Sequence, residues 1–141
     1  MEQRLSLITL GVADLARSRR FYEDGLGWTK GNSEEEVAFY QLNGLILALW
    51  GRAELAEDAQ VPDPGATFSG IALAFTTRNH DEVDEVLELV AAADGTILKP
   101  AGETFWGGYS GYFADPDGHP WEVAWNPAWP IDEAGHVSLG S

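Results

Sequence analysis

The chain has no cysteine among its 141 residues, so disulfides, thiolate catalysis and cysteine-bound metals are excluded. No apolar run approaches the roughly 18 residues that a membrane-spanning helix needs, and no signal peptide is visible. Basic residues are scarce: 8 Lys and Arg stand against 23 Asp and Glu, a formal net charge of -15. This charge repels nucleic acids and anionic membranes. We therefore expect a cytoplasmic protein that binds neither, whose acidic surface serves solubility or attracts a cationic ligand.

The most informative stretch is Tyr109–Pro127, where two aromatic and apolar runs flank the turn-forming residues Asp115–Gly118. This pattern predicts a β-hairpin. Because alternate residues of a strand face opposite sides, Trp121 and Val123 are expected to face the core. The carboxylate of Glu122 then lies on the other face of the sheet.

The remaining chain divides into two halves with the same predicted order of elements, a strand, a helix and three strands. Asp14 and Asn79 are the expected N-caps of the two helices, and Glu82 forms a capping box with Asn79. In the first half, the expected elements cover residues 5–12, 14–26, a short strand opened by Trp28, 37–42 and 45–50. Asn43 and Gly44 are the expected turn between the last two strands, and a short helix is expected at 52–58. In the second half the expected elements cover residues 70–75, 79–95, 96–98, 109–114 and 121–125, with a loop over 100–108.

This repeated order predicts an α+β fold made of two βαβββ modules. Pro62, Pro64 and Gly65 mark the boundary between them. The expected organisation is a first module at 1–60, a linker at 61–69, a second module at 70–127 and an irregular tail at 128–141.

The turn Asp115–Gly118, followed four residues later by Glu122, resembles the closing hairpin of the vicinal-oxygen-chelate superfamily. This superfamily includes glyoxalase I, bleomycin-resistance proteins and extradiol dioxygenases. The segments Gly11–Leu26 and Thr104–Trp125 carry the most specific similarity. The resemblance implies that the two modules form a curved, cup-shaped mixed sheet with helices on the outside, that the concave face holds the site, and that the protein is a homodimer.

The resemblance also implies four metal-ligand positions, which fall on Leu7, Ala48, Gly70 and Glu122. Only Glu122 has a donor group, whereas a catalytic metal needs about three protein ligands. The three histidines, at positions 80, 119 and 136, lie in a predicted helix start, a turn and the tail. We therefore expect no family-type metal site and no cofactor.

Strand alternation and the resemblance together predict a mostly small and apolar cup, a composition typical of small-molecule sites. In apolar surroundings Glu122 is a candidate general acid or base. Tyr112 is either a hydrogen-bond partner or a packing residue. Three interpretations of the loop from Phe105 to Tyr109 are open. It is a mobile flap at the mouth of the cup, a segment whose backbone approaches another group closely, or a packing or dimer contact. The predicted ligand-binding residues are Leu7, Thr9, Ala48, Trp50, Gly70, Ala72, Phe105, Trp106, Tyr109, Tyr112, Glu122 and Asn126.

Three functions are compatible with these residues. The first is metal-free binding of a small organic ligand, cationic if the acidic charge attracts it, as in bleomycin-resistance proteins. The second is a metal-independent lyase or isomerase in which Glu122 moves a proton and Tyr112 polarises the substrate. The third is a metal-dependent lyase or dioxygenase with an atypical site.

Overall fold

The computed structural model describes residues 1, 3, 5–65, 67–69 and 71–140. The chain separates into two compact units, Met1–Thr67 and Phe68–Ser141. Each unit has its own sheet and helices, so the predicted α+β class is confirmed. Among the described residues, no helix has the length and apolar character needed to cross a membrane.

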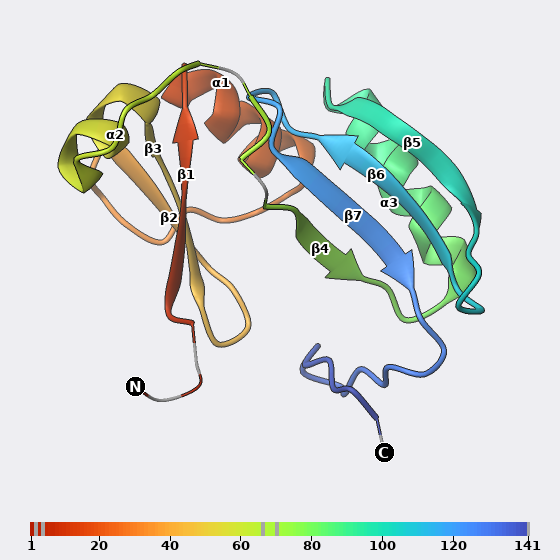
Figure 1. Cartoon of the computed structure of the whole chain (residues 1–141). Coiled ribbons are helices and arrows are strands. Elements are labelled where there is room, and N and C mark those ends of the chain that lie inside the picture. Colours follow the sequence, from red (N-terminus) through yellow and green to blue (C-terminus); the bar gives the residue numbers. More distant parts are fainter. Residues whose placement is uncertain (2, 4, 66, 70, 141) are drawn as a thin grey trace. The chain divides into compact units, whose positions relative to one another are not determined.

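The first unit is built on a three-stranded mixed sheet in the order β1-β3-β2 (Figure 1). Strand β1 (Leu7–Val12) pairs in parallel with β3 (Ile46–Gly51), and β2 (Val37–Gln41) pairs with β3 antiparallel. The predicted turn at Asn43 and Gly44 joins β2 to β3. Gly44 has a φ of 83°, which suits a residue without a Cβ.

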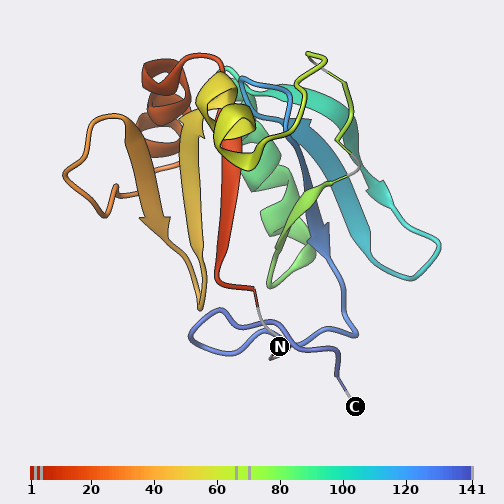
Figure 2. The same ribbon diagram turned by 60° about the vertical axis from the view of Figure 1, so that its left-hand side comes forward.

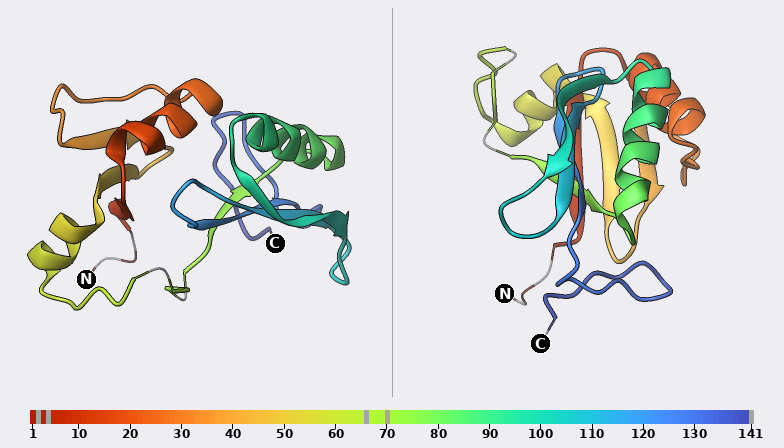
Figure 3. Two further views of the ribbon diagram at one scale, coloured as in Figure 1. Left: turned by 90° about the horizontal axis from the view of Figure 1, so that it is seen from above. Right: turned by 90° about the vertical axis from the view of Figure 1, so that its right-hand side faces the viewer.

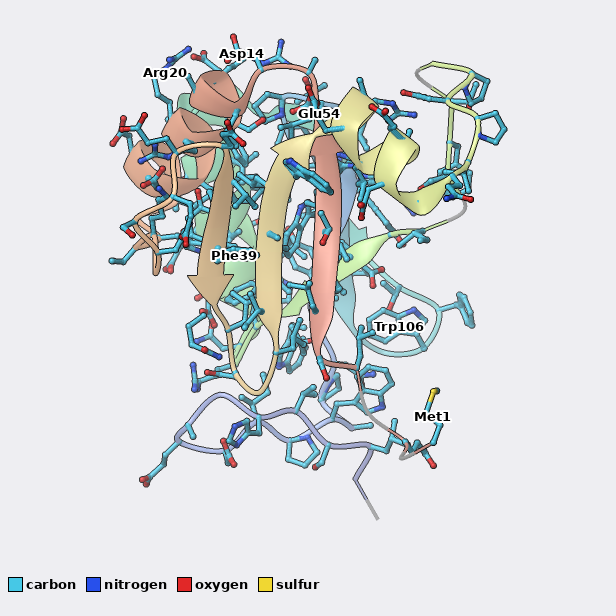
Figure 4. The ribbon with its side chains drawn as sticks, turned by 90° about the vertical axis from the view of Figure 1, so that its left-hand side faces the viewer. Met1, Asp14, Arg20, Phe39, Glu54 and Trp106 are labelled. Carbon is cyan, nitrogen blue, oxygen red and sulfur yellow. The ribbon has the colours of Figure 1, made fainter. Side chains whose placement is uncertain are left out.

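Helix α1 (Leu15–Arg19) begins where expected, because the side chain of Asp14 accepts a hydrogen bond from the backbone N–H of Arg17 at 3.0 Å (Figure 4). It continues directly as a π-helical segment, η1 (Arg20–Gly25). The ring of Tyr22 packs 6.2 Å from that of Tyr40 on β2. This contact identifies the helix-covered face of the sheet. The core there consists of Leu10, Val12, Phe21, Tyr22, Ala38, Tyr40, Leu47 and Leu49.

The short strand expected at Trp28 is wrong: residues 27–36, all of them described, form a loop before β2 (Figure 2). The side chain of Asn32 takes over strand-like pairing, since its Oδ1 accepts from the N–H of Phe39 and its Nδ2 donates to the carbonyl of Val37, both at 2.9 Å. Gly31 adds one backbone bond to Phe39 at 2.7 Å. The side chain of Asn32 thus forms the hydrogen bonds with the backbone of the β2 edge that a neighbouring strand would have formed.

Helix α2 (Arg52–Ala59) follows β3 and agrees with the predicted helix at 52–58. The guanidinium of Arg52 holds the segment after it, with Nε 2.8 Å from an oxygen of Asp63 and a terminal nitrogen 3.1 Å from the carbonyl of Gly65. These bonds fix the path of the chain at the end of the first unit.

The second unit contains a four-stranded sheet in the order β4-β7-β6-β5, with α3 (His80–Ala92) lying over one face (Figure 3). Its strands are β4 (Leu73–Thr76), β5 (Thr96–Glu103), β6 (Tyr109–Ala114) and β7 (Pro120–Trp125). This is the predicted βαβββ order. The buried core of this unit consists of side chains from both elements. They are Val83, Leu87 and Val90 of α3, and Phe113, Trp121 and Val123 of the sheet.

The cap of α3 differs in one detail from the expected capping box. Asn79 Oδ1 accepts from the N–H of Glu82 at 2.9 Å, as predicted. The Glu82 carboxylate, however, accepts from the N–H of Arg78 at 2.8 Å. At the other end of the helix, Asp94 has a positive φ of 64°.

The expected loop at 100–108 begins later, because β5 continues through Pro100 to Glu103 and only residues 104–108 form the loop. Proline is tolerated there since β5 is the edge strand of the sheet and its pairing with β6 shifts register on both sides of Lys99. The tail after β7 contains one isolated bridge, between Ile131 and Val137.

Candidate functional site

The β6–β7 hairpin is closed by a turn that Asp115 organises. Its Oδ1 accepts hydrogen bonds from the N–H groups of Asp117 at 3.0 Å and His119 at 2.9 Å, and Asp115 is only 3% exposed. Gly118 takes a φ of 84°, which favours glycine. The turn fixes the register of the two strands and therefore decides which residues of β6 and β7 lie opposite each other.

Tyr112 and Glu122 are direct cross-strand partners in this register. Burial is the first cause that raises the pKa of Tyr112 above 10.0, followed by the negative charge of Glu122. The phenol is therefore protonated at neutral pH and acts as a hydrogen-bond donor.

This pair lies on the face of the sheet that α3 does not cover. On the alternate positions, Val123 is fully buried, and a Cβ on Gly111 would stand 2.8 Å from a methyl group of Leu87 in α3. Glu122 and Tyr112 therefore point away from the helix. Small residues are their neighbours on this face: Ala74 pairs with Glu122, and the next row contains Ser110 and Ala124.

Tyr109 lies on the opposite face, apart from Tyr112 and Glu122. Its hydroxyl donates to Asp84 of α3 at 2.8 Å, and its ring stacks on the imidazole of His80 at 3.7 Å. The hydrogen bond to Asp84 is the first cause that raises the pKa of Tyr109. Of the alternatives for this residue, the contacts of Tyr109 match packing against the second helix and not a place at the mouth of the cup.

His80 is the centre of an ionic cluster that sequence analysis missed. Its Nε2 lies 3.2 Å from an oxygen of Glu103, and its Nδ1 lies 3.5 Å from one of Asp81. The Glu103 contact is the first cause that raises the pKa of His80 above 6.5. Nothing in the sequence indicated this contact, since Glu103 belongs to the part of β5 that was expected to be loop.

Phe105 and Trp106 lie in the tight turn between β5 and β6. Thr104 closes this turn, its backbone N–H bonding to Gly108 at 3.0 Å and its hydroxyl accepting from the Gly108 N–H at 2.9 Å. A Cβ on Gly108 would stand 1.9 Å from the Trp106 ring. Of the alternatives for this segment, the geometry matches a close backbone approach. Phe105 is fully exposed.

In the first unit, Leu7, Thr9, Ala48 and Trp50 share the face of the sheet opposite η1, because Thr9 pairs with Ala48 and these positions alternate with the helix-facing ones. Ala48 is 1% exposed and Leu7 44%. Ala72 is exposed just before β4. Gly70 lies outside the described residues. The Asn126 side chain accepts from the Ala128 N–H at 3.0 Å and so caps the turn after β7.

The residues do not fit a family-type metal centre. Leu7 and Ala48 have no donor atoms, and position 70 is a glycine. In the part of the chain that the structure describes, no three His, Asp or Glu side chains gather in a way that could hold an ion. Glu122 has the phenol of Tyr112 as its neighbour.

Comparison with known proteins decides the family. The profile of the Glyoxalase/Bleomycin resistance protein/Dioxygenase superfamily matches residues 4–123. The chain belongs to this superfamily. A solved relative, a glyoxalase-related enzyme from Fulvimarina pelagi, is 44% identical with a TM-score of 0.92, and the match covers 99% of this chain and 100% of the relative.

Two further relatives show the range of the superfamily. The metallothiol transferase FosB of Lysinibacillus sphaericus (strain C3-41) is 32% identical over 123 residues, covering 85% of this chain and 80% of FosB. A glyoxalase/bleomycin resistance protein/dioxygenase from Nocardioides is 26% identical with a TM-score of 0.72, covering 89% of this chain and 84% of that one. The predicted superfamily and its fold are thus confirmed.

Proposed function

We propose that this protein binds a small organic cation, without a metal, on the sheet face that carries Tyr112 and Glu122. The observation that carries the proposal is the direct cross-strand pairing of Tyr112 with Glu122. A carboxylate offers about four acceptor positions. These positions can bind an ammonium or guanidinium group of a ligand, and the neighbours of Glu122 on this face, Ala74 and Ala124, are small.

The charge of the whole chain supports a cationic ligand. A formal net charge of -15 raises the local concentration of cations and speeds their encounter with the protein. In the first unit, Leu7 and Trp50 supply apolar surface on one face of the sheet, on the same side as Thr9, whereas Ala48 is buried there. In this proposal the homodimer is the assembled state.

The name of the FosB relatives, metallothiol transferase, indicates a metal and a thiol. These are properties of the FosB proteins. In this chain, three of the four family metal positions have no donor, so we derive no metal-dependent step. One bound divalent ion per chain, measured by mass spectrometry on tag-free protein, would contradict this part of the proposal.

A metal-independent acid–base enzyme is the second candidate function. Tyr112 is a neutral phenol donor fixed against a carboxylate, which is the arrangement that polarising a carbonyl group and moving a proton require. The Fulvimarina pelagi relative is described as a glyoxalase-related enzyme. Under this alternative, the protein would speed deuterium exchange at the carbon next to the carbonyl of hydroxyacetone, and the Glu122→Gln variant would not.

The binding proposal is tested by calorimetric titration with bleomycin, a cationic drug that the superfamily name suggests as a probe. We expect Glu122→Gln to weaken binding by about tenfold, the loss of one charge-assisted contact. The matched control is Glu88→Gln, since Glu88 is exposed on α3 and the substitution changes the net charge equally. Equal affinities of the wild type and Glu122→Gln would refute the proposal.

A further inference from the structure

The first unit contains a pocket of about 480 Å³ that is separate from the face carrying Tyr112 and Glu122. Its walls are the loop residues 28–31 and Tyr40, Gln41 and Leu42 of β2 and its end. All of these residues belong to one compact unit. The volume lies in the range of about 300–1,000 Å³ that is typical of small-molecule sites.

Two sets of contacts hold the walls of this pocket in place. The Trp28 ring packs against Tyr22 at 5.2 Å and against Tyr40 at 5.7 Å, so its plane is fixed by two buried aromatic side chains. The backbone N–H of Trp28 bonds to the carbonyl of Tyr22 at 2.9 Å, at the end of the π-helical segment. The other end of the wall is fixed where Gly31 bonds to Phe39.

The walls contain one charged group, the ammonium of Lys30, and no carboxylate. The chain as a whole has 23 acidic and 8 basic residues. This pocket differs, because its one charged group is positive and therefore disfavours cations. Lys30 donates one hydrogen bond to the carbonyl of Glu34. An ammonium has three donors, so two others can serve a ligand.

The nearby carboxylates already have partners of their own. Glu23, behind Tyr40, is bound by Arg19 at 2.6 Å, and the Glu34 carboxylate accepts from Asn32 at 2.8 Å. Lys30 exerts a weaker electrostatic influence on both. An anion that enters the pocket therefore finds the lysine without displacing a strong ion pair.

We infer that this pocket is a second binding site, for a small planar aromatic carboxylate. The ligand ring packs on the half-buried Trp28, and its carboxylate binds the Lys30 ammonium, with the Gln41 amide nearby. This site has the opposite charge preference to the Tyr112 and Glu122 face. The two proposals therefore concern different ligands and can fail separately.

The test uses three probes of similar shape: 1-naphthoate, the neutral 1-naphthamide and the cationic 1-naphthylmethylamine. We expect naphthoate to bind with a Kd near or below about 1 mM and to shift the Trp28 indole and Gly31 amide signals in NMR spectra. The amide should bind more weakly at the same place, and the amine should leave these signals unchanged.

Two variants decide the role of Lys30. Lys30→Gln should weaken naphthoate binding by about fivefold, the loss of a partly exposed charge-assisted contact, and leave the amide nearly unaffected. Gln41→Glu should abolish naphthoate binding and allow the amine to enter. Lys99→Gln, an equal charge change in the second unit, is the control. Naphthoate shifts at Tyr112 and Glu122 alone, no shifts at all, or unchanged affinity in Lys30→Gln would overturn the inference.

Discussion

Tyr112 stands directly opposite Glu122 across the β6–β7 hairpin. The raised pKa of Tyr112 has burial as its first cause and Glu122 as its second. The two causes can be separated experimentally, because a substitution at Glu122 removes the charge and leaves the phenol ring in place.

In Glu122→Gln, the pKa of Tyr112 should fall but stay above 10.0, since the effect of burial persists. The raised folded-state pKa means that Tyr112 stabilises the fold below pH 10.0 and loses this contribution as the pH rises through the folded value. NMR titration of the tyrosine ring carbons measures the shift. Asp84→Asn is the control, because it should lower the pKa of Tyr109 instead. An unchanged Tyr112 pKa in Glu122→Gln would show that the pair is not formed.

Gly108→Ala should destabilise the protein by about 2–3 kcal/mol, an overpacking cost. The added Cβ would stand 1.9 Å from the Trp106 ring and 2.3 Å from the Trp125 carbonyl oxygen, which is backbone and cannot rotate away. Urea unfolding measures the loss. Gly102→Ala is the matched control, since a Cβ there meets no described atom within 4 Å. A loss below about 0.5 kcal/mol, typical of surface changes, would mean that the turn is open in solution.

The sequence predicted most of the fold because its local signals were strong. Asp14 and Asn79 begin helices where capping chemistry predicts, and the turn at Asp115–Gly118 sets the register that brings Tyr112 to Glu122. Strand alternation then placed both side chains on the same face. These predictions needed only contacts between residues close in the chain.

The wrong predictions concern residues whose structure depends on distant partners. The expected strand at Trp28 was lost because Asn32, a side chain, pairs with the β2 edge. Pro100 suggested a loop, but an edge strand tolerates proline. The contacts of Tyr109 with His80 and Asp84 could not be predicted, because they arise only when α3 packs on the sheet.

Asn32→Ala should cost about 1–2 kcal/mol, because it removes both hydrogen bonds to β2, with the exposed one to Glu34, and leaves the Phe39 N–H without its acceptor. Exchange of the Phe39 amide hydrogen should become faster than in the wild type, and denaturant unfolding gives the free energy. Ser33→Ala, one residue further along the same exposed loop, provides the comparison. The account of the missing strand is contradicted when both variants are equally stable and the Phe39 amide stays protected.

Glu23 should contribute to stability only above acid pH. Its hydrogen bond with Arg19 is the first cause that lowers its pKa below 4.5. The contribution is therefore present above pH 4.5 and is lost as the pH falls through the folded-state value. Because the Arg19 side chain is 37% exposed, we expect only about 0.5–1 kcal/mol. Glu23→Gln should be less stable than the wild type at pH 7 and nearly equal at pH 3, whereas Asp24→Asn should show no such convergence.

His80 should show the opposite pH dependence, because its two carboxylate neighbours favour the charged imidazole. Glu103 is the first cause of its raised pKa, so its stabilising effect is complete below pH 6.5 and is lost as the pH rises through the folded-state value. NMR titration should give His80 a pKa above 6.5, and Glu103→Gln should lower it. Glu88→Gln removes an equal charge from the exposed face of α3 and should have little effect. A His80 pKa in Glu103→Gln that equals the wild-type value would mean that this contact between α3 and β5 is absent in solution. The loss of stability at rising pH would then have to come from another group.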